Sequence, residues 1–403
     1  MTDQDGTVTG GVDTHKETHV AAVVDAIGRI LATKAFPATA AGYRQLLGWM
    51  RSFGALSRVG VEGTGSYGAG LARYLDDQAV AVIEVNRPNR QMRRRRGKND
   101  TVDAEAAARA ALNGEAAATP KAGDGIVESI RALRVTFCSL RATRTRVSNQ
   151  IRDLIVTAPD QLRTTLEPLN AQQRAERCAR FRPGHVADPT EATKAALRTL
   201  ARRYEALTAD LDALRGELDT LTTTANPALC AAKGVGPDVA SILLIVAGDN
   251  PGRLNSDAAL AALCGASPVE ASSGRTVRHR LNQGGNRQDN HALWRIAMVR
   301  RTCDPATKTY FARRRAEGKT DREIMRCLKR FIAREIYQLL TNPPAVPTID
   351  DLRPRRTAAG ITLTHAADQL DIWPTRLSRL ERGHTRDDEL ADRYRRWLTQ
   401  NAA

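Results

Sequence analysis

The sequence predicts an α/β domain followed by mainly helical (all-α) domains. Short β-rich runs alternate with helical stretches over residues 8–112, a heptad repeat follows, and the remainder is rich in helical patterns. The chain has 403 residues, of which 42% are hydrophobic and 26% are charged. This length and composition suffice for two to three domains with sizeable cores, and they exclude a disordered or collagen-like chain.

The first part, residues 1–115, is expected to form a domain around a mixed sheet. Strands are predicted at residues 8–13, 18–24, 30–36, 58–62 and 79–85, and helices at 38–53, around 71–75 and at 101–112. The resulting order is βββαβαβα. The last strand, AVAVIEV, is an apolar run, which is typical of a strand buried on both faces of a sheet.

A helical spacer is predicted over residues 116–225. A long helix is expected at 127–156, and leucine or tyrosine recurs between residues 197 and 221 in alternating steps of three and four. This heptad pattern predicts a coiled coil, either with the helix at 127–156 or with another subunit. A helix packed inside its own subunit is the alternative. A helix-rich domain at 226–345 and a Pro-rich linker with a small helical unit at 346–403 complete the chain.

The charge of the chain favours a polyanionic partner. Lys and Arg number 61 against 45 Asp and Glu, a formal net charge of +16. Such an excess points to nucleic acid, although aromatic residues, at 4%, are too few for base stacking to be the main mode of binding. The densest basic run, at 87–98, is expected to contact an RNA or DNA backbone, or else to be a solvated arm; its cations are Arg87, Arg90, Arg93, Arg94, Arg95, Arg96 and Lys98.

Other classes of protein are not indicated. No apolar run is long enough to span a membrane, and no signal peptide is visible, so a cytoplasmic, nucleoid-associated protein is expected. The six cysteines form no CxxC pair, which argues against a zinc knuckle. The sequence also lacks the GxxxxGK[ST] motif of a nucleotide triphosphatase.

Four acids stand where phosphoryl-transfer chemistry would need them. Asp13 and Glu62 end two predicted strands, and Asp100 and Asp103 share one face of the following helix. Such an oxygen-rich set suits Mg²⁺. Taken singly, each acid could instead be a cap or a turn residue, and Asp100 could serve only as a helix cap. His15, near the first strand end, is interpreted as a surface or strand-face residue, as is the neighbouring His19.

The segments around these acids, GVDTHKETHVAAV, VGVEGTGSYG and KNDTVDAEAAARAAL, resemble the N-terminal motifs of the DEDD transposases. These are insertion-sequence recombinases described as guided by a bridge RNA. The resemblance implies a RuvC-like, ribonuclease-H-type fold for the first domain. It also implies that Asp13, Glu62, Asp100 and Asp103 are the catalytic, metal-binding tetrad, with Lys98 just before the helix.

A second module begins at residue 226. The segment 229–249 has the pattern helix–GVG–helix, and it resembles a helix–hairpin–helix that binds a DNA backbone through the turn at Gly234 and Gly236. A simple tight turn between packed helices is the alternative.

The following segment, LAALCGASPVEASSGRTVRHRLNQGGNRQDNHALWRIA, resembles the second signature of the same family. The resemblance places the catalytic serine directly before the glycine, at Ser273, although Ser272 is adjacent and chemically equivalent. Three basic residues that follow, Arg275, Arg278 and Arg280, suit contacts with a DNA phosphate.

The C-terminal unit resembles a Cro/repressor-type helix-turn-helix, with helices expected at 363–370 and 374–381. The second helix would present Thr375, Arg376 and Arg379 to DNA. Two positions depart from the usual pattern: Asp371 stands in the turn where glycine is usual, and Trp373 stands where a Ser or Thr cap is expected. A helical hairpin used for subunit contact is the alternative.

The family resemblance covers residues 8–342 and implies an insertion-sequence transposase. It would be a Mg²⁺-dependent enzyme that cleaves donor and target DNA through a serine–phosphodiester intermediate, guided by a structured RNA, as a dimer or tetramer. Both modules would have to meet, within one chain or between subunits. Two alternatives remain: a RuvC-like junction nuclease in which water attacks the phosphodiester, and a non-enzymatic DNA-binding regulator.

Overall fold

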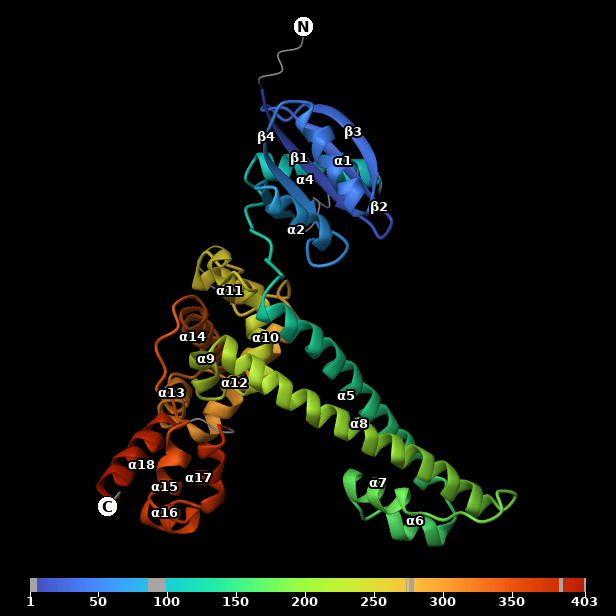
Figure 1. Cartoon of the computed structure of the whole chain (residues 1–403), viewed down its shortest axis with the longest axis vertical. Helices are drawn as coiled ribbons and strands as arrows, with labels where there is room; N and C mark the ends of the chain where they lie inside the picture. Colours follow the sequence, from blue (N-terminus) through green and yellow to red (C-terminus); the bar gives the residue numbers. More distant parts are fainter. Residues whose placement is uncertain (1–5, 86–98, 273, 275–278, 384–386, 402–403) are drawn as a thin grey trace. The chain divides into compact units, whose positions relative to one another are not determined.

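The computed structural model describes residues 6–85, 99–272, 274, 279–383 and 387–401, and it divides into two compact units (Figure 1). The first unit runs to Gly125 and includes the later segment Ala247–Asn255. The second unit comprises Ile126–Val246 and the chain from Ser256 onward. Each unit is described by itself below.

The first unit is built on a five-stranded mixed sheet, as predicted. Its strand order is β3-β2-β1-β4-β5, with bounds Thr7–Thr14 (β1), Thr18–Val24 (β2), Ile30–Pro37 (β3), Ala55–Glu62 (β4) and Ala81–Val85 (β5). Strand β2 runs antiparallel to both of its neighbours, β1 and β3, whereas β4 runs parallel to β1 and β5 runs parallel to β4. Helices α1 (Ala40–Arg51), α2 (Ala69–Asp77) and α4 (Asp100–Leu112) intervene, so the predicted order βββαβαβα is confirmed.

Two glycines decide which helix covers which face of the sheet. Side chains alternate along a strand, so Val8 and Val12 of β1 share one face and pack with residues of α1 and α2 in the main core. On the opposite face, a Cβ atom at Gly11 or Gly60 would collide with the backbone of α4. These glycines therefore allow α4 to lie directly on β1 and β4, opposite α1 (Figure 1).

The expectation that the last strand is buried on both faces is wrong. β5 lies at the edge of the sheet, and although Val82 and Val85 are buried, Ala81 is exposed. Its free edge is partly paired by the chain leaving α4, because the amide of Glu84 donates to the oxygen of Ala118 at 2.7 Å. The carboxylate of Glu84 also accepts a hydrogen bond from Arg253 at 2.9 Å, which ties the segment 247–255 into this unit.

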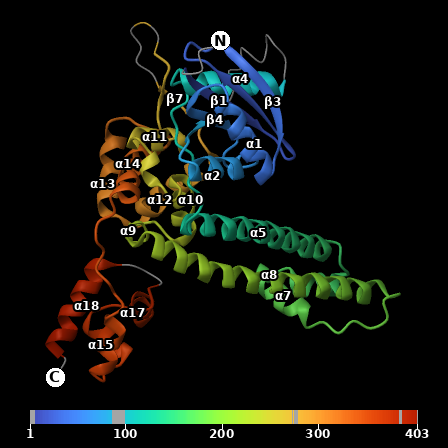
Figure 2. The same ribbon diagram turned by 45° about the horizontal axis from the view of Figure 1, so that its top comes forward.

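The second unit begins with a long helical pair. Helix α5 (Ile126–Val156) packs along α8 (Pro189–Ala225) (Figure 2). The short helices α6 (Asp160–Leu166) and α7 (Ala171–Ala179) complete the cluster (Figure 1). Four heptad positions of α8 are buried: Leu197, Leu207, Leu211 and Leu218. The heptad seam therefore packs on α5 of the same chain. That the pair winds into a coiled coil stays a prediction.

The rest of the second unit is mostly helical, as expected. It contains α9 (Pro227–Ala231), α10 (Pro237–Ala247), α11 (Asp257–Leu263), α12 (Arg287–Cys303), α13 (Pro305–Ala316) and α14 (Asp321–Thr341), with a small hairpin of β6 (Val269–Glu270) and β7 (His279–Arg280). The 3₁₀ turn at Pro251–Arg253 lies in the returning segment of the first unit.

Four short helices end the chain: α15 (Leu352–Ala358), α16 (Leu363–Gln369), α17 (Pro374–Glu381) and α18 (Asp388–Asn401). They share a separate core that includes Leu352, Ala367, Leu377 and Tyr394. The two helices expected here are confirmed, although helix α15 begins at Leu352, within the stretch interpreted as a Pro-rich linker. Among the described residues, no helix has the length and apolarity needed to cross a lipid bilayer.

Candidate acidic centre and serine hairpin

The ends of β1 and β4 bring two predicted acids to one edge of the sheet. Gly11 pairs with Gly60 in the parallel register, and Asp13 and Glu62 each lie two residues further along their strands. Because side chains two apart point to the same face, both acids belong to the face that α4 covers. The Thr14 hydroxyl donates to the backbone oxygen of Glu62 at 2.8 Å and joins the two strand ends.

Helix α4 begins at the same edge and contributes the other two acids. Asn99 is its N-cap, since the Asn99 side chain accepts a hydrogen bond from the amide of Thr101 at 3.1 Å. Asp100 and Asp103 occupy the first turn, where the helix dipole favours negative charge. The capping role is thus filled by Asn99, which leaves the carboxylate of Asp100 available for another task.

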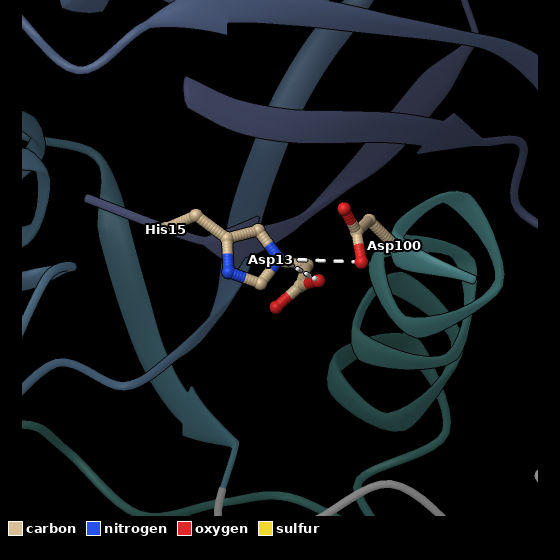
Figure 3. A group of neighbouring side chains, drawn as sticks. All are labelled: Asp13, His15 and Asp100. Atoms are coloured by element: carbon tan, nitrogen blue, oxygen red, sulfur yellow. Dashed lines mark ion pairs between the residues drawn. The ribbon is translucent and has the colours of Figure 1, made fainter. Parts of the chain in front are cut away.

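Asp13 and Asp100 meet around a histidine. The Nε2 atom of His15 lies 3.2 Å from Oδ2 of Asp13 and 3.3 Å from Oδ1 of Asp100 (Figure 3). These three side chains offer ligand atoms that all lie within 4.8 Å of one another. Among the described residues, Glu62 and Asp103 are not members of this group, although Asp103 is 3% exposed and close enough to affect the charge of Asp13.

Burial and neighbouring negative charges disfavour the ionised form of the Asp13 carboxyl. Its residue surface is only 7% exposed, and burial raises the pKa of its carboxyl above the usual value. His15 opposes this shift in the pKa, whereas the negative charges of Asp103 and Asp100 add to it. A bound cation would stabilise the buried negative charge of Asp13 and offset its repulsion with Asp100 and Asp103.

The donor set fits a divalent metal. Carboxylate oxygens are the preferred ligands of Mg²⁺, and an imidazole nitrogen is also accepted by softer divalent ions such as Mn²⁺. The Nε2 atom of His15 is buried, and it faces the carboxylates of Asp13 and Asp100. The sequence analysis gives His15 no role in the site; its position two residues after Asp13, just past the end of β1, was the available signal.

Of the two segments predicted to contact a nucleic-acid backbone, the structure describes one. The run Arg87, Arg90, Arg93, Arg94, Arg95, Arg96 and Lys98 lies outside the described residues. The turn at Gly234 and Gly236 is described, and Gly234 has a φ of 87° and sits against the backbone of Ile296. The next helix, α10, carries Asp238, whose carboxylate is engaged by Arg134 and Arg295. Packing explains this turn, and its contact with a DNA backbone stays a prediction.

The predicted nucleophile stands in the sequence between β6 and β7, the two strands that pair in the serine hairpin. Ser273, Arg275 and Arg278 lie outside the described residues, whereas Ser272, Gly274 and Arg280 lie within them, and Ser272 and Arg280 are exposed. The pairing of Val269 with Arg280 and of Glu270 with His279 brings the two ends of the serine segment together.

The chain segments on either side of the hairpin pack against each other through their backbones. A Cβ atom at Gly285 would collide with the backbone of Gly265, so the two glycine segments touch directly. The side chain of Asn286 accepts from the amide of Gln288 at 2.8 Å and caps α12. The side-chain Nδ2 of Asn290 donates to the backbone oxygens of Cys264 and Gly265, at 2.8 and 3.1 Å. These contacts give the segment 284–286 a structural role.

Gly285→Ala is therefore expected to destabilise the protein, because the new methyl group has only backbone to displace. The free energy of unfolding should fall by about 1–3 kcal/mol, as for an overpacked core position. Gly284→Ala is the matched control, since a Cβ there meets only the Asn282 side chain, at 3.3 Å. Thermal unfolding of both variants measures the difference. Equal melting temperatures would contradict this account of the hairpin's support.

The C-terminal helices present the predicted recognition face to solvent. Thr375, Arg376 and Arg379 of α17 are exposed, and Arg376 pairs with Asp387 at 2.7 Å. Asp371, in the turn between α16 and α17, has a φ of 51°. This left-handed conformation is the one for which glycine is preferred, and Asp tolerates it better than most residues. The departure from the sequence pattern is thus accommodated by the backbone.

Comparisons with known proteins agree with the two modules. A family model for DEDD transposases of the IS110 type, described as "Transposase", matches residues 10–158. A second, "Transposase IS116/IS110/IS902 family", matches residues 226–312, so that together the two cover more than half of the chain. The chain is also 36% identical over 106 residues to the "Insertion element IS110 uncharacterized 43.6 kDa protein" of Streptomyces coelicolor, a match that spans 26% of each protein.

The fold and the acidic centre thus coincide with the first matched range, and the serine hairpin coincides with the second. The chain belongs to the IS110-type family of DEDD transposases. This confirms the resemblance that the sequence motifs indicate. The C-terminal helices α15–α18 lie outside both matched ranges.

Proposed function

We propose that this protein is an insertion-sequence transposase that cleaves and exchanges DNA strands with the help of a divalent metal. The observation that carries the proposal is the meeting of Asp13 and Asp100 at the edge of the sheet, within a domain matched by the transposase family. Asp13, Glu62, Asp100 and Asp103 are the metal-binding acids in this proposal, and Mg²⁺ is the expected ion. When bound, the metal supplies charge stabilisation to a reacting phosphoryl group.

Ser273 is the proposed nucleophile. Its Oγ attacks the phosphorus of a DNA phosphodiester, a P–Oγ bond forms, and the P–O3′ bond breaks. The seryl proton is balanced by protonation of the leaving 3′ oxygen. A 3′ hydroxyl of the partner duplex then attacks the phosphorus of the phosphoserine: a new P–O3′ bond forms, the P–Oγ bond breaks, and the proton of the attacking hydroxyl is balanced by protonation of the seryl oxygen. The strands are thereby rejoined and Ser273 is released. Each step exchanges one phosphoester for another, so no nucleotide triphosphate is needed. Arg275, Arg278 and Arg280 would offset the phosphate charge.

A structured RNA from the element is the proposed guide, in a dimer or tetramer of the protein. The support for the RNA is the excess of positive charge, 61 Lys and Arg against 45 Asp and Glu, together with the basic run at 87–98. Contacts between Lys or Arg and the phosphates of a nucleic acid make binding strongly dependent on salt concentration.

The test of the function is a strand-exchange reaction. The full chain is incubated with duplexes carrying the joined ends of the element and its target, with RNA transcribed from the element's flanks. We expect recombinant strands in Mg²⁺, and none in EDTA or after ribonuclease treatment. Cleaved but unjoined strands would support a junction nuclease instead, and activity in EDTA would contradict the role given to the acids.

The C-terminal helices carry a second, accessory proposal, namely that α17 binds duplex DNA in the major groove. It is supported by the left-handed turn at Asp371 and by the exposure of Thr375 and Arg379.

Arg379→Ala is expected to weaken binding of the full chain to element DNA by about 5- to 100-fold if the guanidinium contacts a base edge. Fluorescence anisotropy at fixed salt measures the dissociation constant. Arg353→Ala, which removes an exposed arginine of α15, serves as the control and should change the constant less than about twofold. Equal effects of the two variants would favour the subunit-contact alternative.

A further inference from the structure

A cavity of about 1070 Å³ opens beside the serine hairpin in the second unit. One wall is the loop from Gly265 to Ala271 together with Arg280, and the other is formed by residues of α13, α14 and the turn between them. This volume slightly exceeds the usual range for ligand pockets, about 300–1,000 Å³. This space is large enough for a small organic anion and is built by described residues.

The lining of the cavity is strongly basic. Its cations are Arg280, Arg313, Arg314, Lys319, Arg326, Lys329 and Arg330, and its one acid is Glu323. Glu323 is already engaged, since its carboxylate accepts hydrogen bonds from the amide and hydroxyl of Thr320, at 2.9 and 2.7 Å. Arg314 pairs with Glu317, and Arg330 pairs with Asp257 at 2.9 Å, whereas the ion pairs within the described part of the chain include none of Arg280, Lys319 and Arg326. The cavity therefore attracts an anion.

A buried lysine forms part of the lining. Lys329 is 6% exposed, and its Nζ donates to Oδ1 of Asn290 at 2.9 Å. An ammonium group has three donors, and among the described residues Asn290 is its one acceptor. Burial lowers the pKa of Lys329, because the charge has lost its hydration. An anionic oxygen entering the cavity would replace that hydration.

An exposed aromatic ring stands on the same wall. Phe331 is 54% exposed, and its ring meets Tyr310 edge to face, with centroids 6.0 Å apart. Both residues line the cavity. The guanidinium of Arg313 lies 5.6 Å from the centre of the Tyr310 ring. Flat rings beside arginines form the platform on which single-stranded nucleic-acid binders stack bases.

We propose that this cavity holds one unpaired nucleotide of a nucleic-acid strand, with its phosphate on the cations and its base stacked on Phe331. A phosphate alone would not require an exposed ring, and an apolar ligand would not require cations such as Arg280, Lys319 and Arg326. One stacked base is also consistent with a chain whose aromatic content is 4%. The proposal rests on the proposed function only in that the protein binds nucleic acid; it does not depend on cleavage.

The test is a cycle between Phe331 and the base. The full chain carrying Ser273→Ala, in EDTA, is titrated with a short single-stranded DNA and with the same strand containing one abasic site. A duplex of the same sequence serves as a reference. Phe331→Ala is expected to weaken binding to the intact strand by about 5- to 100-fold, as for one lost base stack. Against the abasic strand, Phe331→Ala should have no further effect, and the duplex should not respond.

Two more variants make the result specific. Phe331→Trp should restore binding, because it restores a flat ring. Arg326→Ala should weaken both the intact and the abasic strand, whereas Arg322→Ala, which removes an exposed arginine of the same helix outside the cavity, should leave the phosphate contacts intact. An RNA strand of the same sequence identifies the source: coupling in DNA assigns the cavity to a DNA strand, and coupling in RNA alone assigns it to RNA. Independence of Phe331 and the base in both strands would overturn the proposal.

Because cleavage plays no part in this titration, its failure can be told apart from failure of the proposed function. A chain that exchanges strands while Phe331 and the base act independently would lose only the cavity proposal. A chain that shows the coupling without strand exchange would lose only the transposase proposal.

Discussion

Ser273→Ala is expected to lower the rate of strand cleavage by about 10³-fold or more while leaving DNA binding unchanged. The hydroxyl is the group that forms the bond to phosphorus, so its removal eliminates the covalent step, whereas binding depends on cations elsewhere. Single-turnover cleavage of a junction duplex in Mg²⁺ measures the rate, and filter retention of the same duplex measures the binding.

Ser272→Ala is the matched control for this prediction. The two serines are adjacent and chemically equivalent, so an effect confined to Ser273 assigns the nucleophile to the position directly before Gly274. If Ser272→Ala abolished cleavage and Ser273→Ala did not, the assignment would move by one residue. Cleavage that survives both substitutions would support the alternative in which water attacks the phosphodiester.

Asp13→Asn is expected to act on stability and on metal binding in opposite directions. The pKa of Asp13 is raised by burial, so its protonated form favours the folded state, and its charge costs stability once the pH rises through that pKa. Without divalent metal at neutral pH, Asp13→Asn should therefore raise the melting temperature. Stability of the wild-type chain should fall as the pH rises through the same region.

With metal present the order reverses. Saturation of the wild-type site at 100 times its dissociation constant adds about 2.7 kcal/mol of stability, which raises the melting temperature by several degrees. Asp13→Asn should gain little, and strand cleavage should be lost. Asp77→Asn, at an exposed position on α2, serves as the control and should respond to metal as the wild type does. A variant that binds Mg²⁺ as well as the wild type would remove Asp13 from the metal site.

Much of the first unit follows from its sequence. The period-two strands and the helical stretches predict all five strands and three helices in their order, because each element is determined by local hydrophobic spacing. Gly11 and Gly60 could also have been used: each stands two residues before an acid and marks the face that α4 covers. The sequence thus marks Asp13 and Asp100 as candidates, whereas their meeting depends on the packing of α4 against the sheet.

Other features depend on contacts between residues that are far apart in the sequence. Local sequence patterns do not predict such contacts. Arg253 reaches Glu84, on the edge strand β5, from a segment that returns to the first unit. His15 gains its significance only when α4 places Asp100 beside it. The cavity beside the serine hairpin requires α13 and α14 to pack together, which brings Phe331 to Tyr310.

The measurement that tests the central claim most directly is the trapping of a covalent protein–DNA adduct. The full chain is incubated with a suicide DNA substrate carrying the junction, the flanking RNA and Mg²⁺, and any adduct that survives a denaturing gel is mapped by peptide mass. A transposase that works through its serine gives an adduct on the peptide containing Ser273, and the adduct disappears in both Ser273→Ala and Asp13→Asn. Cleaved DNA without an adduct, or an adduct that persists in either variant, would contradict the mechanism.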